Sequence, residues 1–163
     1  SKDKLLRFLK RTKEFDALKN LGERGFYICL NCIRGEKVKK MKINVEKVKE
    51  KLRKQIIGLI QLGWRSRHIK IGFDDTLKEI RKGKKGFLIL AEDVAERTKR
   101  NILREFQGDY FCIFKKSQLG NFIGKGEVGI VFVPETKFGL KLKNLLVQYL
   151  ELDFKEVTTG CKK

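Results

Sequence analysis

Two closely spaced cysteines and a single histidine are the residues of this sequence that could hold a metal ion or take part in catalysis. Cys29 and Cys32 have the spacing of a zinc knuckle, but a structural zinc ion needs four ligands and no second pair follows. His68 is the only histidine, which excludes a histidine-based catalytic pair or metal cluster. A cofactor fold would need a glycine-rich loop after a strand and an acidic residue about 20 positions later, and the sequence has no such pattern. We therefore expect a protein without enzymatic activity, metal or cofactor.

The net charge points instead to a polyanionic partner. The 163 residues include 39 Lys and Arg against 20 Asp and Glu, which leaves a formal charge of +19. In a small protein such an imbalance favours nucleic acid as the partner. An acidic membrane surface would require a basic amphipathic helix with bulky apolar residues, and we find no such helix, no apolar run of transmembrane length and no signal peptide. We expect a cytoplasmic monomer that contacts no membrane.

The spacing of apolar residues predicts a layered α/β domain that would position the basic residues. Apolar residues recur at steps of three and four from Val45 to Leu59, which predicts an amphipathic helix capped by Asn44 and ended by Gly63. Further helices are expected at 76–82, 94–106, 117–123 and 138–149, and buried strands at 87–91, 110–114 and 129–133. This alternation is typical of a sheet with helices on both faces. Ahead of it, residues 5–10 and 26–29 favour two strands of a small separate sheet.

Three segments, in order, resemble the kink-turn-binding ribosomal protein superfamily over about residues 52 to 150. The first runs from Gly72 through Phe73-Asp74-Asp75-Thr76 to Gly83, and is similar to the family's turn of glycine, any residue, asparagine and glutamate before a lysine-bearing helix. The second is Phe87-Leu88-Ile89-Leu90-Ala91-Glu92-Asp93-Val94, and the third is Leu119-Gly120-Asn121-Phe122-Ile123-Gly124 ahead of a strand. The resemblance implies a three-layer α-β-α sandwich with a mixed sheet, and binding of structured RNA without catalysis.

The resemblance also implies how the turn would meet RNA. In the family, the turn and the amides of the helix N-terminus contact sheared guanine–adenine pairs of a sharply bent RNA. Gly72 would allow close backbone approach, and Lys78, one helical turn later, would meet phosphate. Asp74 and Asp75 replace the family's asparagine and glutamate, and an aspartate offers acceptors only. The alternative is that Asp74 or Asp75 merely caps the helix.

Basic residues are expected to form a shared RNA-binding face around this turn. Those flanking the turn and its helix are Arg65, Arg67, Lys70, Lys82, Lys84 and Lys85. On the helix after Asp93, steps of three and four align Arg97, Arg100 and Arg104 on one face. Arg97, Arg100 and Lys125 complete the candidate site, and the alternative is a solvated charged surface. Trp64 could stack on a base, but its apolar size favours the core.

The N-terminal part resembles a second bacterial family, YlxR. The similarity lies in Leu5-Leu6-Arg7-Phe8 and in Glu23-Arg24-Gly25-Phe26-Tyr27-Ile28-Cys29, which is close to that family's Gly-Arg-Gly-Ala-Tyr-Val-Cys. The Arg-x-Cys-x-x-Cys segment with which YlxR proteins usually begin does not precede Leu5, so we expect a small, truncated α+β module. The predicted organisation is a YlxR-like module at 1–42, a kink-turn-binding-type domain at 43–153 and a basic tail at 154–163.

The predicted function is non-catalytic binding of structured RNA in the setting of the ribosome or of RNA processing. The candidate target is a kink-turn or a related bend in ribosomal, transfer-like or ribozyme RNA, with other ribonucleoprotein components as further partners. Two alternatives stay open. The chain could serve as the substrate-recognition partner of an RNA-modifying enzyme on another chain, or it could coat nucleic acid without specificity.

Overall fold

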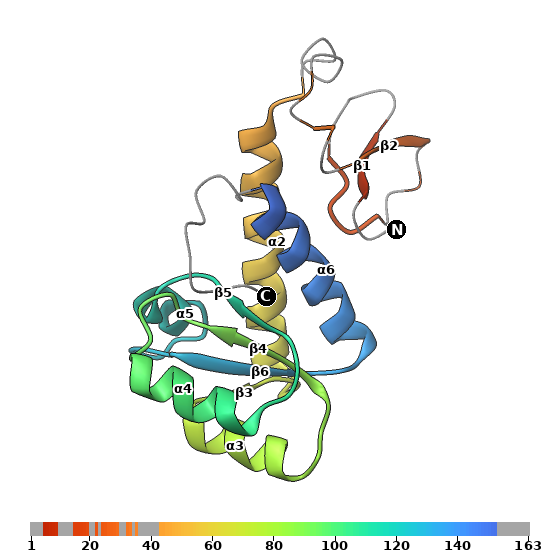
Figure 1. Ribbon diagram of the computed structural model, residues 1–163. Helices are drawn as coiled ribbons and strands as arrows, with labels where there is room; N and C mark the ends of the chain where they lie inside the picture. The colour runs from red at the N-terminus through yellow and green to blue at the C-terminus, as the bar shows by residue number, and fades with distance from the viewer. Residues whose placement is uncertain are drawn as a thin grey trace. The chain divides into compact units, whose positions relative to one another are not determined.

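The computed structural model describes residues 5–9, 15–19, 22, 24–29, 32, 33, 35 and 43–152, which are drawn in colour in Figure 1. One compact unit combines the described residues up to Ile56 with residues 144–152, and a second unit spans Ile57–Lys143. The predicted tail at 154–163 and the lysine-rich stretch at 37–42 lie outside the described residues. Within the described part, no helix is long and apolar enough to cross a membrane. The same residues contain no group of three or more His, Cys, Asp or Glu suited to a metal ion.

The first unit contains the small sheet expected from the sequence. Strand β1 (Leu5–Leu9) pairs antiparallel with β2 (Gly25–Cys29), so that Phe8 lies opposite Phe26. Their rings stack with centroids 5.7 Å apart, and the ring of Phe15 lies 5.5 Å from that of Phe8. Because Phe8 and Phe15 are almost fully buried, this aromatic cluster forms a core for the sheet.

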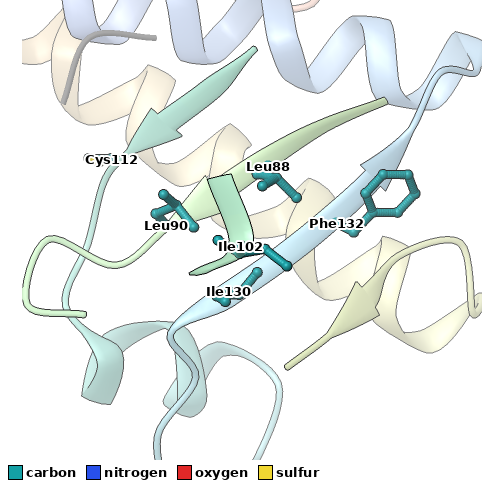
Figure 2. Packing of buried hydrophobic residues seen from close by; sticks show 6 residues of the cluster. All are labelled: Leu88, Leu90, Ile102, Cys112, Ile130 and Phe132. Carbon is teal, nitrogen blue, oxygen red and sulfur yellow. The ribbon is translucent and has the colours of Figure 1, made fainter. Parts of the chain in front are cut away.

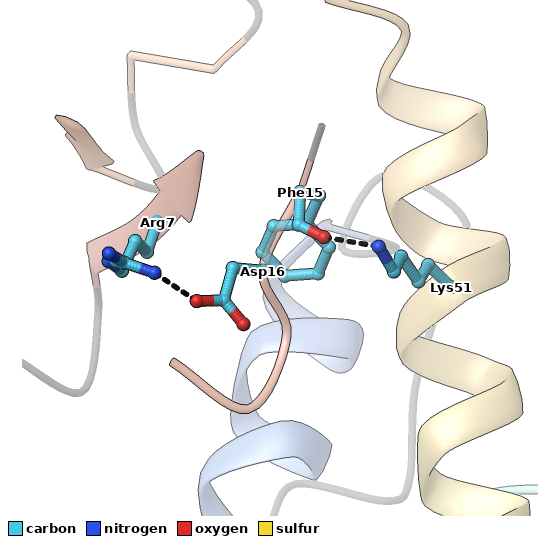
Figure 3. A network of polar contacts seen from close by, with 4 residues as sticks. All are labelled: Arg7, Phe15, Asp16 and Lys51. Atoms are coloured by element: carbon cyan, nitrogen blue, oxygen red, sulfur yellow. Dashed lines mark hydrogen bonds and ion pairs between the residues drawn. The ribbon is translucent and has the colours of Figure 1, made fainter. Parts of the chain in front are cut away.

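A buried ion pair fixes the segment that follows β1. The carboxylate of Asp16, which is only 2% exposed, pairs with the guanidinium of Arg7. The Asp16 N–H also donates to the Arg7 carbonyl oxygen at 2.8 Å. Helix α2 (Val45–Arg65) adds Lys51, whose Nζ donates to the Phe15 carbonyl oxygen at 2.5 Å (Figure 3). Removing one partner of a buried pair costs roughly 3–5 kcal/mol, so these contacts hold the segment firmly.

The second unit is built on a four-stranded mixed sheet, as the fold prediction requires. Its strands are β3 (Lys70–Ile71), β4 (Gly86–Leu90), β5 (Tyr110–Cys112) and β6 (Ile130–Pro134), in the order β3-β6-β4-β5. β4 runs parallel to β5, whereas β6 is antiparallel to both β3 and β4. The strand at Lys70 and Ile71, which pair with Phe132 and Val131, was not among the strands predicted from the sequence. A strand of two residues is too short to show an alternating pattern in the sequence.

Helices cover both faces of this sheet, which confirms the three-layer α-β-α prediction. On one face, alternate strand residues form a cluster with Ile102 of α4 (Glu96–Glu105), as Figure 2 shows. That face is covered by α4 and by α3 (Phe73–Arg81), through residues such as Leu77 and Phe106. The strand residues between them point to the other face of the sheet. There the rings of Phe87 and Phe111 meet edge to face, with their centroids 5.5 Å apart. Each fully buried Leu, Ile or Phe contributes about 1.5–3 kcal/mol, so this core dominates the stability of the unit.

The helices follow the prediction, with shifted ends that have physical causes. The side chain of Asn44 accepts a hydrogen bond from the Glu46 N–H at 2.9 Å, which confirms the predicted cap of α2. α2 ends at Arg65 instead of Gly63, because Gly63 serves close packing and does not end the helix. A Cβ at Gly63 would lie 2.8 Å from the Phe138 ring and 3.0 Å from Ile69. The remaining helices are α5 (Lys116–Phe122) and α6 (Lys137–Leu152).

We predict a pH-dependent loss of stability when Glu79 of α3 is changed to Gln. The Lys84 ammonium, at 2.8 Å, donates to the Glu79 carboxylate and lowers its pKa below the ordinary value of 4.5, while burial opposes this effect. A carboxyl whose pKa falls on folding stabilises the fold above its unfolded pKa and loses this contribution as the pH falls through its folded pKa. Urea unfolding should therefore show Glu79→Gln to be less stable than the parent at neutral pH, with the difference fading in acid.

The control is Glu50→Gln, since Glu50 is exposed and its pair with Lys54 is a surface contact at 3.2 Å. That variant should unfold almost like the parent at every pH. A Glu79→Gln deficit that stays constant down to strongly acidic pH would contradict the proposed ionic contribution.

Candidate nucleic-acid interface

Four segments of the second unit meet at one end of the sheet, which we call the turn end. They are the start of α3 at 72–75 and the loops at 91–94, 113–116 and 123–129. Backbone hydrogen bonds tie them together. The Gly72 N–H donates to the Ile130 carbonyl oxygen at 2.9 Å, and the Glu92 N–H donates to that of Phe114 at 2.8 Å. The turn end therefore presents connecting segments on a rigid support, which is where binding residues usually lie.

The start of α3 is shaped by Gly72 and is open to a ligand. Gly72 has a φ of 92° and a ψ of 166°, a conformation that favours glycine, and no side chain caps the helix that begins at Phe73. The first backbone hydrogen bond of the helix is donated by the Thr76 N–H to the Gly72 carbonyl oxygen, at 3.2 Å. The amides of residues 73–75 are thus left without a side-chain acceptor at the positive end of the helix dipole. Such a terminus suits anions and base-edge acceptors.

Asp74 and Asp75 do not cap the helix, contrary to the alternative considered from the sequence. Both lie inside the first turn of α3, where the N-cap position belongs to Gly72. Both side chains are exposed, and acidic residues in a first turn favour the helix through its dipole. Lys78 is exposed one turn further along the same helix. The three side chains are therefore accessible to a partner at the turn end.

Several predicted basic residues do gather beside this turn. Arg65, Arg67 and Lys70 line a cavity of about 440 Å³ together with Asp75 of α3. Lys125, in the loop before β6, places its Nζ 5.3 Å from the centroid of the Trp64 ring. Cations from α2, β3 and the loop at 123–129 are thus combined with the uncapped start of α3.

The prediction of one basic face around the turn is wrong for the residues after α3. Lys82, Lys84 and Lys85 lie at the far end of that nine-residue helix, roughly 13 Å from the turn at 1.5 Å per residue. Lys82 and Lys84 pair with Glu79, at 3.6 and 2.8 Å. Lys85 lines a separate cavity of about 520 Å³ at that end of the sheet.

The arginine row forms a further basic surface. Arg97, Arg100 and Arg104 are exposed on α4, and their spacing of three and four residues aligns them as predicted. α4 lies beside α3 (Figure 1), and the exposure of the three side chains leaves the row accessible to a partner.

Two residues have roles at the turn end that differ from, or go beyond, the sequence interpretation. Trp64, expected in the core, is only partly buried, because it lies in the last turn of α2 and borders two cavities. Its position directly before Arg65 and close to Arg67 in the sequence was the available signal. Gly120 of α5 lets the loop at 123–129 approach the helix, since a Cβ there would lie 2.4 Å from the Gly126 carbonyl oxygen. The close packing of this loop against α5 thus requires glycine at position 120 of the Leu119-Gly120 motif.

Comparisons with known proteins agree with this architecture. Residues 54–139, just over half of the chain, match the ribosomal protein L7Ae/L30e/S12e/Gadd45 family. A solved protein with unknown function from Bacillus halodurans C is 26% identical, with a TM-score of 0.52 over 56% of this chain and 96% of that one. A Giardia lamblia 15.5kD RNA binding protein is 19% identical, with a TM-score of 0.48 over 63% and 90% of the two chains. Comparison with curated proteins gives no match.

We predict that Gly120→Ala loosens the turn end. The added methyl group would meet backbone atoms of Lys125 and Gly126, which cannot rotate away, so the free energy of unfolding should fall by about 1–3 kcal/mol. Gly126→Ala is the matched control, because no atom lies within 4 Å of the Cβ it would add. Denaturant unfolding of both variants tests the prediction, and equal stability of the two would contradict it.

Proposed function

Since the chain belongs to the ribosomal protein L7Ae/L30e/S12e/Gadd45 family, we propose that it binds structured RNA through the turn end. Family membership supports RNA as the partner. The finer proposal is recognition of a kink-turn or a related bend in ribosomal, transfer-like or ribozyme RNA, within ribosome or RNA-processing machinery. The role is binding without catalysis.

The observation that carries this proposal is the uncapped start of α3 behind Gly72. Its amides and positive dipole end favour phosphate and base acceptors, and among the described residues no side chain forms a capping hydrogen bond with them. Arg65, Arg67 and Lys70 lie alongside and supply the charge that holds a phosphate backbone. A purely structural turn has no need of this combination.

Asp74 and Asp75 set the kind of RNA edge that fits. A carboxylate accepts hydrogen bonds and donates none, so these residues suit the amino and imino groups of guanine. The same charges repel nearby phosphates, which weakens any contact that brings the backbone against them. The proposed preference is therefore for exposed base edges at a bend over regular duplex.

The N-terminal part of the chain, at 1–42, is proposed to be a YlxR-like module that adds a second RNA contact. The support is the sequence from Glu23 to Cys29, most of which forms β2, and the exposure of Tyr27 at 54% on that strand. An exposed tyrosine on a strand is suited to stacking on an unpaired base. The boundary of this module near residue 43 stays a prediction.

The experiment that tests the function is a comparison of RNA and DNA binding at several salt concentrations. We expect a folded kink-turn RNA to bind more tightly than duplex DNA of equal length. Its log affinity should fall by roughly 0.7–0.9 per phosphate contact for each tenfold rise in salt. Equal affinity for both nucleic acids at moderate salt would favour the alternative of non-specific coating.

Variants of the turn separate docking on RNA from a structural role. Lys78→Ala and Gly72→Val should each weaken RNA binding, the first through a lost phosphate contact and the second through blocked backbone approach. Asp74→Asn should bind a kink-turn RNA more tightly than the parent, because it restores a donor and removes a negative charge near phosphates. Affinities and melting temperatures are measured together.

Lys78→Ala is the cleanest of these variants, since Lys78 is exposed and its loss should leave the fold intact. Gly72→Val also strains a backbone with φ of 92°, so its affinity is interpreted only with its melting curve. Unchanged affinity in all three variants would shift the proposed contact to Arg97, Arg100 and Arg104.

A further inference from the structure

Trp64 stands between two cavities at the turn end. The smaller, about 330 Å³, is lined by Gln61, Phe122 and Ile123, and the larger, about 440 Å³, reaches from Trp64 to Asp75. Trp64 and Arg65 are the residues that both cavities share. Lys125, which closely follows the residues of the smaller cavity in the chain, lies over the ring at 5.3 Å. The larger cavity has no residue of that loop in its lining.

The lining of the larger cavity matches the parts of a nucleotide. Trp64, Ile69 and Ile71 contribute the apolar part of this lining. Base stacking on an aromatic side chain tolerates every base, because each has a π face. Arg65, Arg67 and Lys70 bring three cations to the same space, which suit the phosphate that flanks a base. A volume of about 440 Å³ lies in the range of small-ligand sites.

The backbone at Arg67 gives independent support for a functional role of this cavity. The His68 N–H donates to the Gly63 carbonyl oxygen at 2.8 Å and the Arg67 N–H to that of Trp64 at 3.1 Å, which is the Schellman end of a helix. This motif places Arg67 in the left-handed region, with a φ of 57°. Glycine is the usual residue there, because any side chain is strained. The end of α2 therefore holds a charged side chain, where glycine is usual, at the wall of the larger cavity, and strain of this kind is a reason to test Arg67 for a binding role.

We propose that the larger cavity binds one unpaired nucleotide of the RNA, with its base stacked on Trp64 and its phosphate held by Arg65 and Arg67. This inference rests on the proposed RNA-binding function and adds a nucleotide site beside the turn. Asp75 is shared between the cavity and the first turn of α3. The nucleotide bound here is therefore a close neighbour of the base edges that meet the turn.

The test uses the fluorescence of Trp64, which is the only tryptophan of the chain. A kink-turn RNA is titrated into the full chain, together with RNAs in which each unpaired nucleotide is replaced in turn by an abasic residue. We expect the intact RNA to quench the emission, and one abasic position to abolish the quenching. Trp64→Leu should lower the affinity for intact RNA by roughly tenfold, whereas Trp64→Phe, which keeps an aromatic ring, should lower it far less. When the Trp64→Leu variant is titrated with the RNA that carries the critical abasic position, its affinity should fall no further. The protein variant and the abasic residue both remove the same stacking contact.

Arg67→Gly is the complementary variant, because it keeps the backbone shape and removes the guanidinium. It should melt no lower than the parent and bind the RNA on the order of fivefold more weakly. Arg67→Asn, a residue that also tolerates a positive φ, should behave likewise.

The outcomes separate the nucleotide site from the function on which it rests. If the RNA binds with unchanged emission, or if Trp64→Leu and Trp64→Phe bind alike, the site is disproved while RNA binding stands. If Trp64→Leu does not fold, the abasic series on the parent chain decides alone. Adenosine and guanosine monophosphate are titrated in parallel, and quenching by them without any RNA binding would assign the cavity to a free nucleotide and overturn the proposal.

Discussion

The pairing of β6 on both of its edges is the constraint on which the second unit depends. β6 bonds antiparallel to the short β3 on one side and to β4 on the other. The backbone just before and at its start also accepts hydrogen bonds from Ala91 and Gly72, each at 2.9 Å. The loop after β4 and the start of α3 are therefore positioned by a single strand. A shift of β6 by one residue would turn its side chains to the opposite faces and would move both loops.

Much of this fold could be predicted because its signals are local. The amphipathic spacing from Val45 to Leu59 and the apolar run from Phe87 to Leu90 each fix a helix or a strand by their own residues. The exceptions depend on partners distant in the chain. β3 exists only because β6 offers it a free edge, and Gly63 is a glycine because Phe138 packs against it. The residues that surround β3 and Gly63 in the sequence show no pattern that predicts either contact.

The candidate site was predicted less completely for a related reason. The residues of the turn from Gly72 to Lys78 follow one another, so their proximity is given by the chain. The basic residues on either side of α3 look equivalent in the sequence, yet a helix of nine residues carries Lys82 and Lys84 to the opposite end of the sheet. Trp64 is the opposite case, because the structure brings it closer to the site than the sequence suggests. Its size favours the core, yet its position at the end of α2 leaves it beside the basic residues of the turn end.

The left-handed backbone at Arg67 sets stability and binding against each other at a single residue. Selection of variants for heat resistance alone would favour glycine at this position, because glycine relieves the strain and disturbs no packing of the core. The selected protein would express and fold well while it lost a cation from the wall of the Trp64 cavity. Arg67 is therefore a position that thermostability engineering of this chain should hold fixed.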